Sequence, residues 1–394
     1  MPWPIPTLTP IQRPQPISLA TWLPILFAVA ATVAAAVLVL WPHGKSTQTA
    51  AFWVLLIGAP ACACGLLAGW RLNRWEGEQV AAEESERERD RVELLWRDWC
   101  RRHLSVAHAE AFLPQAIEVA ALADRDADVP VNLSRSIGFD WAKNTPREHK
   151  CQVLLDRVAA GFNDRLKELR EVEVMLVLDD RSFVGQDVWK SEVKRVFGKV
   201  MEGVEVDVDV VFGLDCAAWV AENIDSVDAP AKLVIAAQLW HGNDDHTFSE
   251  GAAAVLFEPR TASVGQRANL SAPVEGHVLR PMTTGDETLK TDLSQLAAMQ
   301  VTPDKLTHVW FAGCREPLTV AATASLDSLQ KETPVARLID HVTGNPGPVS
   351  GWIALAIALE SGRQNPGLQL VASHETGSDQ TQLCIVAPGR FEGN

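Results

Sequence analysis

The chain has 394 residues, 47% of them hydrophobic, and a formal net charge of −15, which suits one large domain or two. Residues 1–75 contain no Asp or Glu and only four basic residues, so residues 76–394 carry a charge of −19. Such an acidic segment repels phosphate backbones and argues against nucleic-acid binding. The seven cysteines are odd in number and scattered, which excludes a secreted disulfide framework and favours reduced thiols in the cytosol.

Residues 1–16, MPWPIPTLTPIQRPQP, form a tail that contains six prolines. Because proline restricts φ, this density favours an extended, polyproline-II-like conformation. Two interpretations stay open for the tail. It is either disordered, or it docks in an aromatic groove.

Residues 17–70 are predicted to form a transmembrane hairpin. The stretch 17–41 has 25 residues without a charge, and the apolar stretch 51–70 follows after a nine-residue link. Each stretch is long enough to cross a hydrocarbon layer of about 30 Å. Arg71 and Arg74 follow the second span, whereas the link carries only one lysine. The positive-inside tendency therefore predicts a multi-pass protein of the inner membrane with both ends in the cytoplasm.

Residues 71–146 are predicted to be a juxtamembrane helical segment. Its first part, residues 76–105, is rich in Glu and Arg, with pairs such as Glu86 and Arg89 at i,i+3 spacing. This pattern favours a solvated stalk, with a coiled-coil contact as the alternative.

Residues 147–394 alternate between helix and strand patterns, which predicts an α/β domain with a mostly parallel sheet covered on both faces. Two segments, SEGAAAVLFEP and SDQTQLCIVAP, each place an acidic turn before an apolar strand that ends at Pro, which indicates a duplicated unit. The expected helices include 152–168, 187–201, 215–224 and the helix within 343–362. The expected strands are 171–180, 204–213, 232–240, 251–259, 306–313, 368–374 and 381–388.

Three segments of this domain resemble the thiolase and β-ketoacyl synthase superfamily. They are FSEGAAAVLFEP (248–259), the strand HVWFAG (308–313) and the glycine loop with its helix, TGNPGPVSGWIALAIALESG (343–362). The resemblance covers roughly residues 150–390 and implies a thiolase-like, duplicated α/β sheet domain. It also implies a site with a Cys nucleophile at a helix start and two polar groups for the oxyanion and for proton transfer.

The candidate site residues are Cys216, Ala312 and Asn345. Cys216 in LDCAAWVAENI follows a strand, as the nucleophile of the family does, but its small neighbours also suit a buried structural thiol. The His of the family would fall near Ala312, which can neither accept a proton nor donate to an oxyanion, and His308 lies four residues too early to replace it. Asn345 matches the Asn of some members. The resemblance therefore implies a vestigial site with no catalytic residues, and no cofactor or metal is expected.

Two polar stretches are further candidate sites. Glu205, Asp207 and Asp209 alternate with valines, which places the carboxylates on one face of a strand, either facing solvent or forming an acidic docking edge for a protein partner. HGNDDH (241–246) is expected to be a solvated loop rather than a metal site. The sequence contains no Walker loop or Rossmann fingerprint.

The layout of a membrane hairpin, a charged helix and a thiolase-like domain resembles the type VI secretion lipase adapter family. The resemblance implies a catalytically inactive adapter or chaperone that loads a lipase effector onto a secretion spike protein. The alternative is a membrane-associated acyl-transfer or condensing enzyme that uses Cys216 and Asn345. A homodimer through the sheet edge is expected by analogy with thiolase-like domains.

Overall fold

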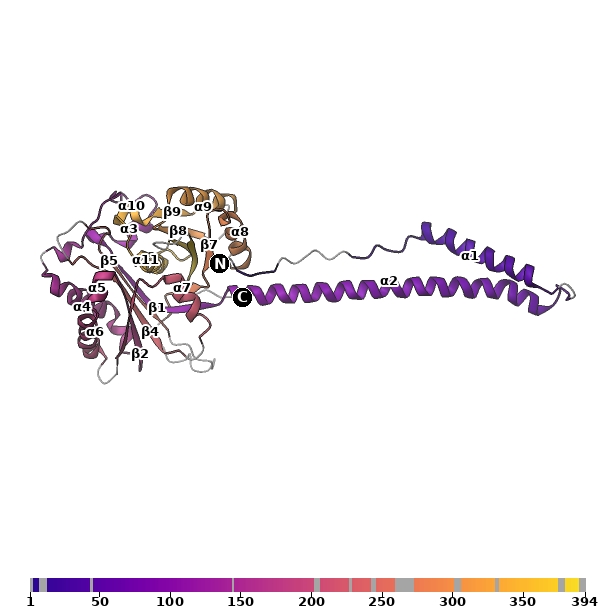
Figure 1. Ribbon diagram of the computed structural model, residues 1–394, viewed down its shortest axis with the longest axis horizontal. Helices are drawn as coiled ribbons and strands as arrows, with labels where there is room; N and C mark the ends of the chain where they lie inside the picture. Colours follow the sequence, from indigo (N-terminus) through magenta and orange to yellow (C-terminus); the bar gives the residue numbers. More distant parts are fainter. Residues whose placement is uncertain are drawn as a thin grey trace. The chain divides into compact units, whose positions relative to one another are not determined.

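In the computed structural model, two compact units are present. One consists of Met1–Pro4 together with Arg97–Asn394, and the other of Ile5–Trp96. The larger unit contains the sheet and the candidate site (Figure 1). The structure describes residues 3–6, 13–42, 45–143, 145–201, 206–226, 229–241, 246–258, 273–300, 306–329, 333–374 and 380–389.

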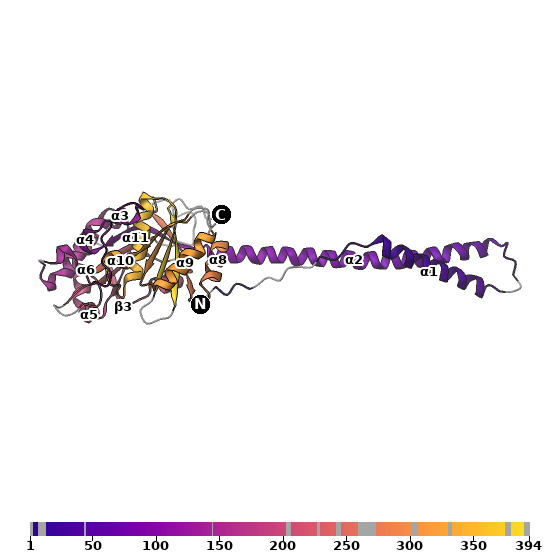
Figure 2. The same cartoon turned by 90° about the horizontal axis from the view of Figure 1, so that it is seen from above.

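The smaller unit is a pair of helices. Helix α1 (Leu19–Leu40) has 22 residues and none of them is buried, and helix α2 (Ala50–Cys100) has 51 residues and is apolar in its first part. The two helices lie side by side, as the thiol of Cys64 and the carbonyl oxygen of Leu26, 3.3 Å apart, indicate (Figure 2). Both are long and apolar enough to cross a membrane; at 1.5 Å per residue α1 spans about 33 Å.

The segment expected to be helical as far as residue 146 departs from helix at Cys100. The chain continues as strand β1 (His103–Phe112), which pairs with strands on both sides. The expected start of the folded domain at 147 therefore falls too late, because the larger unit includes the chain from Arg97. HLSVAHAEAF alternates between polar and apolar residues as a strand does, but a bulge between Val106 and His108 interrupts the alternation.

The larger unit is built on one sheet with the strand order β3-β2-β4-β5-β1-β6-β11-β10-β8-β9, and β7 pairs with β11. The first five positions and the last five repeat one arrangement about the β1–β6 pair, which confirms the predicted duplication. The strands after β1 are β2 (Val172–Leu178), β3 (Val206–Phe212), β4 (Ala231–Gln238), β5 (Gly251–Phe257), β6 (Gly276–Leu279), β7 (Met282–Thr284), β8 (Leu306–Ala312), β9 (Val335–Leu338), β10 (Leu368–His374) and β11 (Thr381–Pro388).

The sheet is mixed, and the expectation of a mostly parallel sheet was wrong. β2 is parallel to β3 and β4, and β8 is parallel to β9 and β10. The last strand of each half, β5 or β11, runs antiparallel to both of its neighbours. The six-residue link between β10 and β11 is too short for a helical crossover, so the chain returns directly and forms an antiparallel pair.

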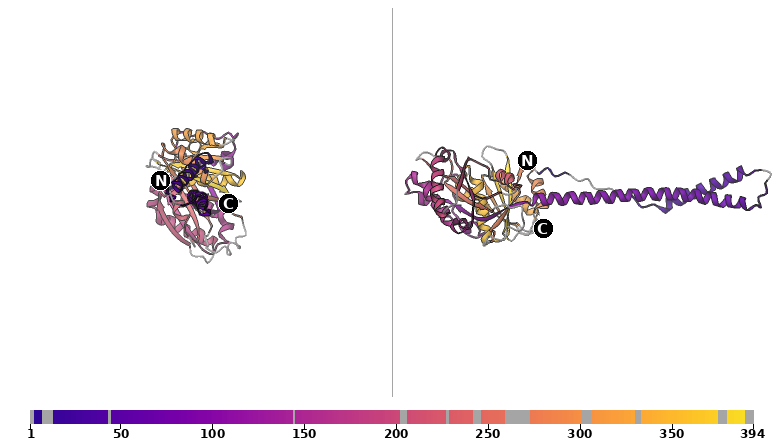
Figure 3. Two further views of the ribbon diagram at one scale, coloured as in Figure 1. Left: turned by 90° about the vertical axis from the view of Figure 1, so that its right-hand side faces the viewer. Right: turned by 90° about the horizontal axis from the view of Figure 1, so that it is seen from below.

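Helices cover the sheet in layers. The helices of the larger unit, besides the end of α2, are α3 (Val119–Ala123), α4 (Arg147–Leu166), α5 (Asp180–Val184), α6 (Gln186–Val200), α7 (Cys216–Asn223), α8 (Leu289–Met299), α9 (Glu316–Leu329), α10 (Ile339–Thr343) and α11 (Ser350–Gln364), with short 3-10 turns at Pro114–Ala116 and Asp140–Ala142. In Figure 3 the first half appears in magenta to pink and the second half in orange to yellow. α4 and α6 pack together on the first half, and α8 and α9 pack together on the second.

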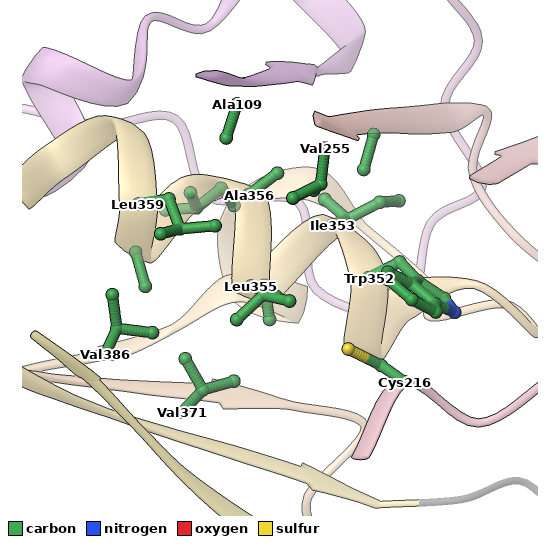
Figure 4. Packing of buried hydrophobic residues seen from close by; sticks show 14 of the residues in the cluster. Ala109, Cys216, Val255, Trp352, Ile353, Leu355, Ala356, Leu359, Val371 and Val386 are labelled. Atoms are coloured by element: carbon green, nitrogen blue, oxygen red, sulfur yellow. The ribbon is translucent and has the colours of Figure 1, made fainter. Parts of the chain in front are cut away.

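Helix α11 forms the centre of the core. It contacts β1 and β5 of the first half as well as β8, β10 and β11 of the second. Figure 4 shows Ala109 and Val255 on one side of it, and Val371 and Val386 on the other. Because α11 is covered on all sides, its sequence WIALAIAL is apolar all round and lacks the polar stripe of a surface helix.

Candidate functional site

Cys216 occupies the first turn of α7, at a helix start of the kind where the resemblance implies a nucleophile. The carboxylate of Asp215 caps the helix and accepts a hydrogen bond from the backbone N–H of Ala218 at 2.7 Å, as Asp commonly does at a helix start. The indole N–H of Trp352 from α11 donates to the carbonyl oxygen of Leu214 at 2.9 Å. Figure 4 shows the thiol of Cys216 beside this Trp352 ring.

The thiol itself is buried. Cys216 is 7% exposed and belongs to the core cluster around α11. Burial raises the pKa of the Cys216 thiol well above its usual value, and the charges of Cys384 and Asp215 raise it further. Since the thiolate is the reactive form, this raised pKa disfavours a nucleophilic role at neutral pH despite the place of the thiol at a helix start.

At the position where the resemblance expects a His, the structure has a tight bend. Ala312 at the end of β8 is fully buried, and Gly313 has a φ of +67°. A side chain on Gly313 would lie 3.1 Å from the carbonyl oxygen of His374, so glycine suits this bend. The Gly313 N–H donates to the carboxylate of Asp340 at 2.7 Å. The bend after β8 is therefore a closely packed turn.

His308 does not reach this end of the strand, as the sequence indicated. It lies near the beginning of β8, and its Nε2 is 2.9 Å from the carbonyl oxygen of Ala123 while its Nδ1 is 3.0 Å from the hydroxyl of Thr307. Its imidazole is buried among groups at the opposite end of β8 from Ala312.

Asp340 is a titratable group that the sequence analysis missed. Burial raises the pKa of this carboxyl to about 7, and the hydrogen bond from Gly313 lowers it only in part. The Cys314 thiol lies close by, and burial followed by the charge of Asp340 raises its pKa to about 12. The signal in the sequence was a lone acidic residue in the stretch before the glycine loop, which looks like any polar loop residue.

Asn345, in the glycine loop, is held by the chain around it. Its backbone N–H donates to the carbonyl oxygen of Arg135 at 2.8 Å, and its carbonyl oxygen accepts from the Ser249 N–H at 2.9 Å. Its side-chain amide donates to the hydroxyl of Ser136 at 3.2 Å. A side chain at Gly344 would overlap the Arg135 carbonyl and the Ser249 hydroxyl, so the loop is pressed against these segments.

Gln238 fills the space beneath the loop. Its amide nitrogen donates to the Ser249 carbonyl oxygen at 2.7 Å, and its amide oxygen accepts from the Val349 N–H at 3.2 Å. A side chain at Gly347 would overlap the Gln238 amide. The polar groups near the start of α11 are thus bonded to one another.

A cavity of about 20 Å³ remains beside this loop. That volume accommodates about one water molecule, whereas pockets for small organic ligands are far larger, roughly 300–1,000 Å³. The lining residues are Leu113, Pro114, Gln238, Ser249, Glu250, Gly251, Ile339, Asp340, Thr343, Asn345, Pro346, Ser350 and Ile353.

Glu250, the acidic residue of the motif SEGAAA, has a structural role. Its carboxylate forms a buried ion pair with Lys150, with 2.6 Å between Nζ and Oε1, and accepts the backbone N–H groups of Phe139 and Trp240 at 2.8 and 2.9 Å. These donors satisfy the hydrogen-bonding capacity of the buried Glu250 carboxylate. The motif thus joins α4, the segment before it and the end of β4.

The carboxylates proposed for partner binding lie on the edge strand β3. Asp207 and Asp209 are exposed and oppose Glu173 and Met175 of β2, while Glu205 lies outside the described residues. Charged side chains on an edge strand discourage uncontrolled strand pairing. Their role in binding stays a prediction.

The HGNDDH segment is described only at its two ends. His241 lies with its Nε2 2.8 Å from the hydroxyl of Ser182, and burial lowers the pKa of this imidazole. His246 stacks on Trp240 with ring centroids 3.8 Å apart. Asp244 and Asp245 lie outside the described residues, and within the described part of the chain no three His, Cys, Asp or Glu side chains gather as metal ligands.

No protein-family model matches the chain, and no curated protein matches it. Solved structures that resemble it include an oxazolomycin ketosynthase domain from Streptomyces albus, with a TM-score of 0.47 at 16% identity over 73% of this chain and 96% of that one. Peroxisomal 3-ketoacyl-CoA thiolase from Saccharomyces cerevisiae has a TM-score of 0.46 at 10% identity, over 73% of this chain and 98% of that one. Acetamide-bound OleA from Xanthomonas campestris has a TM-score of 0.44 at 13% identity, over 72% of this chain and 98% of that one. These values assign no activity to this chain.

Proposed function

We propose that the chain is a membrane-anchored binding protein whose thiolase-like domain carries out no acyl transfer. The observation that carries this proposal is the state of Cys216, a buried thiol with a raised pKa at the one position where the fold would need a thiolate.

The anchor is the pair α1 and the first part of α2, which are long and apolar enough to cross a membrane. Arg71 and Arg74 directly follow the apolar part of α2. By the positive-inside tendency, the chain is a multi-pass protein of the inner membrane with the sheet domain in the cytoplasm.

The partner in this proposal is a cytoplasmic effector protein. The resemblance to type VI secretion lipase adapters suggests a lipase, which the chain would hand to a secretion spike protein. Asp207 and Asp209 on the edge strand β3 provide an exposed acidic surface for it. A homodimer through a sheet edge, which the resemblance implies, stays a prediction.

The test uses the full-length tagged protein in native membranes, with chemical cross-linking, solubilisation in mild detergent and mass spectrometry. Wild type and Cys216→Ala are compared as baits, and Asp207→Asn/Asp209→Asn probes the edge. Recovery of a lipase or spike protein equally with wild type and Cys216→Ala supports the adapter, and its loss with the double variant locates the contact. Recovery of only an acyl carrier protein, lost with Cys216→Ala, overturns the proposal.

The second candidate is an acyl-transfer or condensing enzyme, because Cys216 stands in the first turn of α7 as a nucleophile would. It requires a conformation in which the thiol reaches solvent and Asn345 releases Ser136. Incubation of the membrane-bound protein with a radiolabelled acyl-CoA decides between the two. A Cys216-dependent covalent acyl adduct supports the enzyme, and its absence supports the adapter.

A further inference from the structure

The N-terminal tip of the chain docks on the folded domain. Met1–Pro4 belongs to the same compact unit as Arg97–Asn394, and Trp3 is only 6% exposed. Its indole Nε1–H donates a hydrogen bond to the carbonyl oxygen of Pro281 at 3.0 Å. Its ring meets Trp99 edge to face, with ring centroids 6.2 Å apart. Trp3 therefore buries its ring and satisfies its single donor.

The surface that receives Trp3 is held in place by other contacts. The guanidinium of Arg280 lies 4.0 Å from the centre of the Trp99 ring, and its Nε donates to the Trp99 carbonyl oxygen at 3.1 Å. Its Nη2 lies 2.6 and 2.7 Å from the two carboxylate oxygens of Asp225. Arg280 thus fixes Trp99 by stacking on its ring and by one hydrogen bond to its backbone, and Asp225 holds the guanidinium in place.

Gln300 ties the same surface to the sheet. Its amide nitrogen donates to the carbonyl oxygens of Cys100 and Arg280, both at 2.7 Å. The last turn of α2 and the residue after β6 are thereby joined without any contribution from Trp3. The surface is preformed, and Trp3 is a ligand on it, because none of these contacts would be lost if the tail left.

We propose that Trp99, Arg280 and Pro281 form a binding site for a tryptophan that is followed by proline, and that the chain's own Trp3-Pro4 occupies it. We name these three residues the clip site. Prolines beside the tryptophan lower the entropy that the tail loses on docking. The inference is independent of the proposed function.

Docking at the clip site closes residues 5–96 into a loop whose two ends enter the same unit. Within that loop the tail makes weak contacts. Arg13 and Glu86 form an exposed ion pair at 2.7 Å, and the Trp75 indole N–H donates to the Gln15 carbonyl oxygen at 3.1 Å. Exposed pairs of this kind contribute little to stability. Release of Trp3 would therefore free the tail, whereas the last turn of α2 would remain part of the larger unit.

The experiment measures peptide binding in trans. Full-length wild type and Trp3→Ala, each in detergent micelles, are titrated against dye-labelled PWPIPT, and fluorescence anisotropy reports binding. Trp3→Ala has an empty clip site and is expected to bind the peptide at least about tenfold more tightly than wild type, whose site is occupied. Trp3→Phe keeps a ring but loses the donor to Pro281, so an intermediate affinity is expected.

Two controls separate the site from non-specific adsorption. The peptide PAPIPT should not bind any variant. Trp75→Ala removes a different tryptophan that touches the tail and leaves the clip site occupied, so it should behave like wild type. Equal binding of PWPIPT to wild type and Trp3→Ala, or no binding to a folded Trp3→Ala, overturns the proposal.

Discussion

Helices α7 and α11 occupy equivalent places in the two halves of the fold, each leading into the fourth strand of its half. Their starts lie together, because a Cβ on Gly351 would be 3.6 Å from the Cβ of Cys216. Yet α7 has eight residues, whereas α11 has fifteen and supplies the centre of the core. At equivalent positions in the fold, α7 thus holds a buried thiol, whereas α11 fills the space between the strands. Position in the fold alone therefore does not make a site.

The largest expected effect is in the core around α11. Leu355→Ala removes a buried side chain and leaves a cavity, so the free energy of unfolding should fall by about 2–5 kcal/mol. Urea denaturation followed by tryptophan fluorescence measures it. Leu38→Ala in α1, which belongs to the other compact unit, should change it by less than about 0.5 kcal/mol. Equal losses would contradict the central role of α11.

Gly344→Ala tests the glycine loop before α11. Its φ of +86° disfavours a side chain, and a methyl group would overlap the Arg135 carbonyl. The free energy of unfolding should fall by about 1–3 kcal/mol. Gly198→Ala in α6, with open space around it, is the matched control and should stabilise by about 0.5–1 kcal/mol. A tolerated Gly344→Ala would show that the loop is not pressed against Arg135.

The pH dependence of stability tests the bend at the end of β8. Because burial raises the pKa of Asp340 from 3.8 to about 7, the folded state holds this proton more tightly than the unfolded state. The contribution of this protonated carboxyl to the free energy of unfolding is complete below about pH 4 and is lost as the pH rises through about 7. Asp340→Asn, which still accepts a bond from Gly313, should remove this loss in denaturation experiments between pH 4 and 8. An unchanged profile would assign the dependence to other groups.

The smallest effect is expected at α7. Cys216→Ala should lower the free energy of unfolding by only about 1 kcal/mol, because one buried sulfur is lost. In the native protein at pH 8, iodoacetamide should leave Cys216 unmodified and react with it only after denaturation in urea, as mass spectrometry would report. Rapid alkylation of native Cys216 would instead support the acyl-transfer alternative.

Much of the fold could be predicted from local pattern. The expected strands 368–374 and 381–388 match β10 and β11, and the apolar stretch after the glycine loop is α11. β1, β6, β7 and β9 were missed, because β6, β7 and β9 are only three or four residues long and a bulge interrupts the alternation in β1. Such strands owe their existence to neighbouring strands more than to their own sequence.

The candidate site was less predictable. Cys216 and Asn345 lie at the helix start and in the loop where the resemblance placed them, but the groups that hold them come from elsewhere in the chain. Asn345 bonds to Ser136, more than two hundred residues away, and the raised pKa of Asp340 depends on its burial. Neither feature can be recognised from the residues that are adjacent to it in the sequence.

The sequence by itself determined the apolar helices, the alternation of helix and strand and the duplication, because these follow from periodicity and from composition along short stretches. Only the tertiary structure decided that β5 and β11 run antiparallel, that the Cys216 thiol is buried and that Trp3 docks beside Trp99. Each of these depends on groups that are distant in the chain. Burial and hydrogen bonding act between neighbours in space, and those neighbours exist only once the chain has folded.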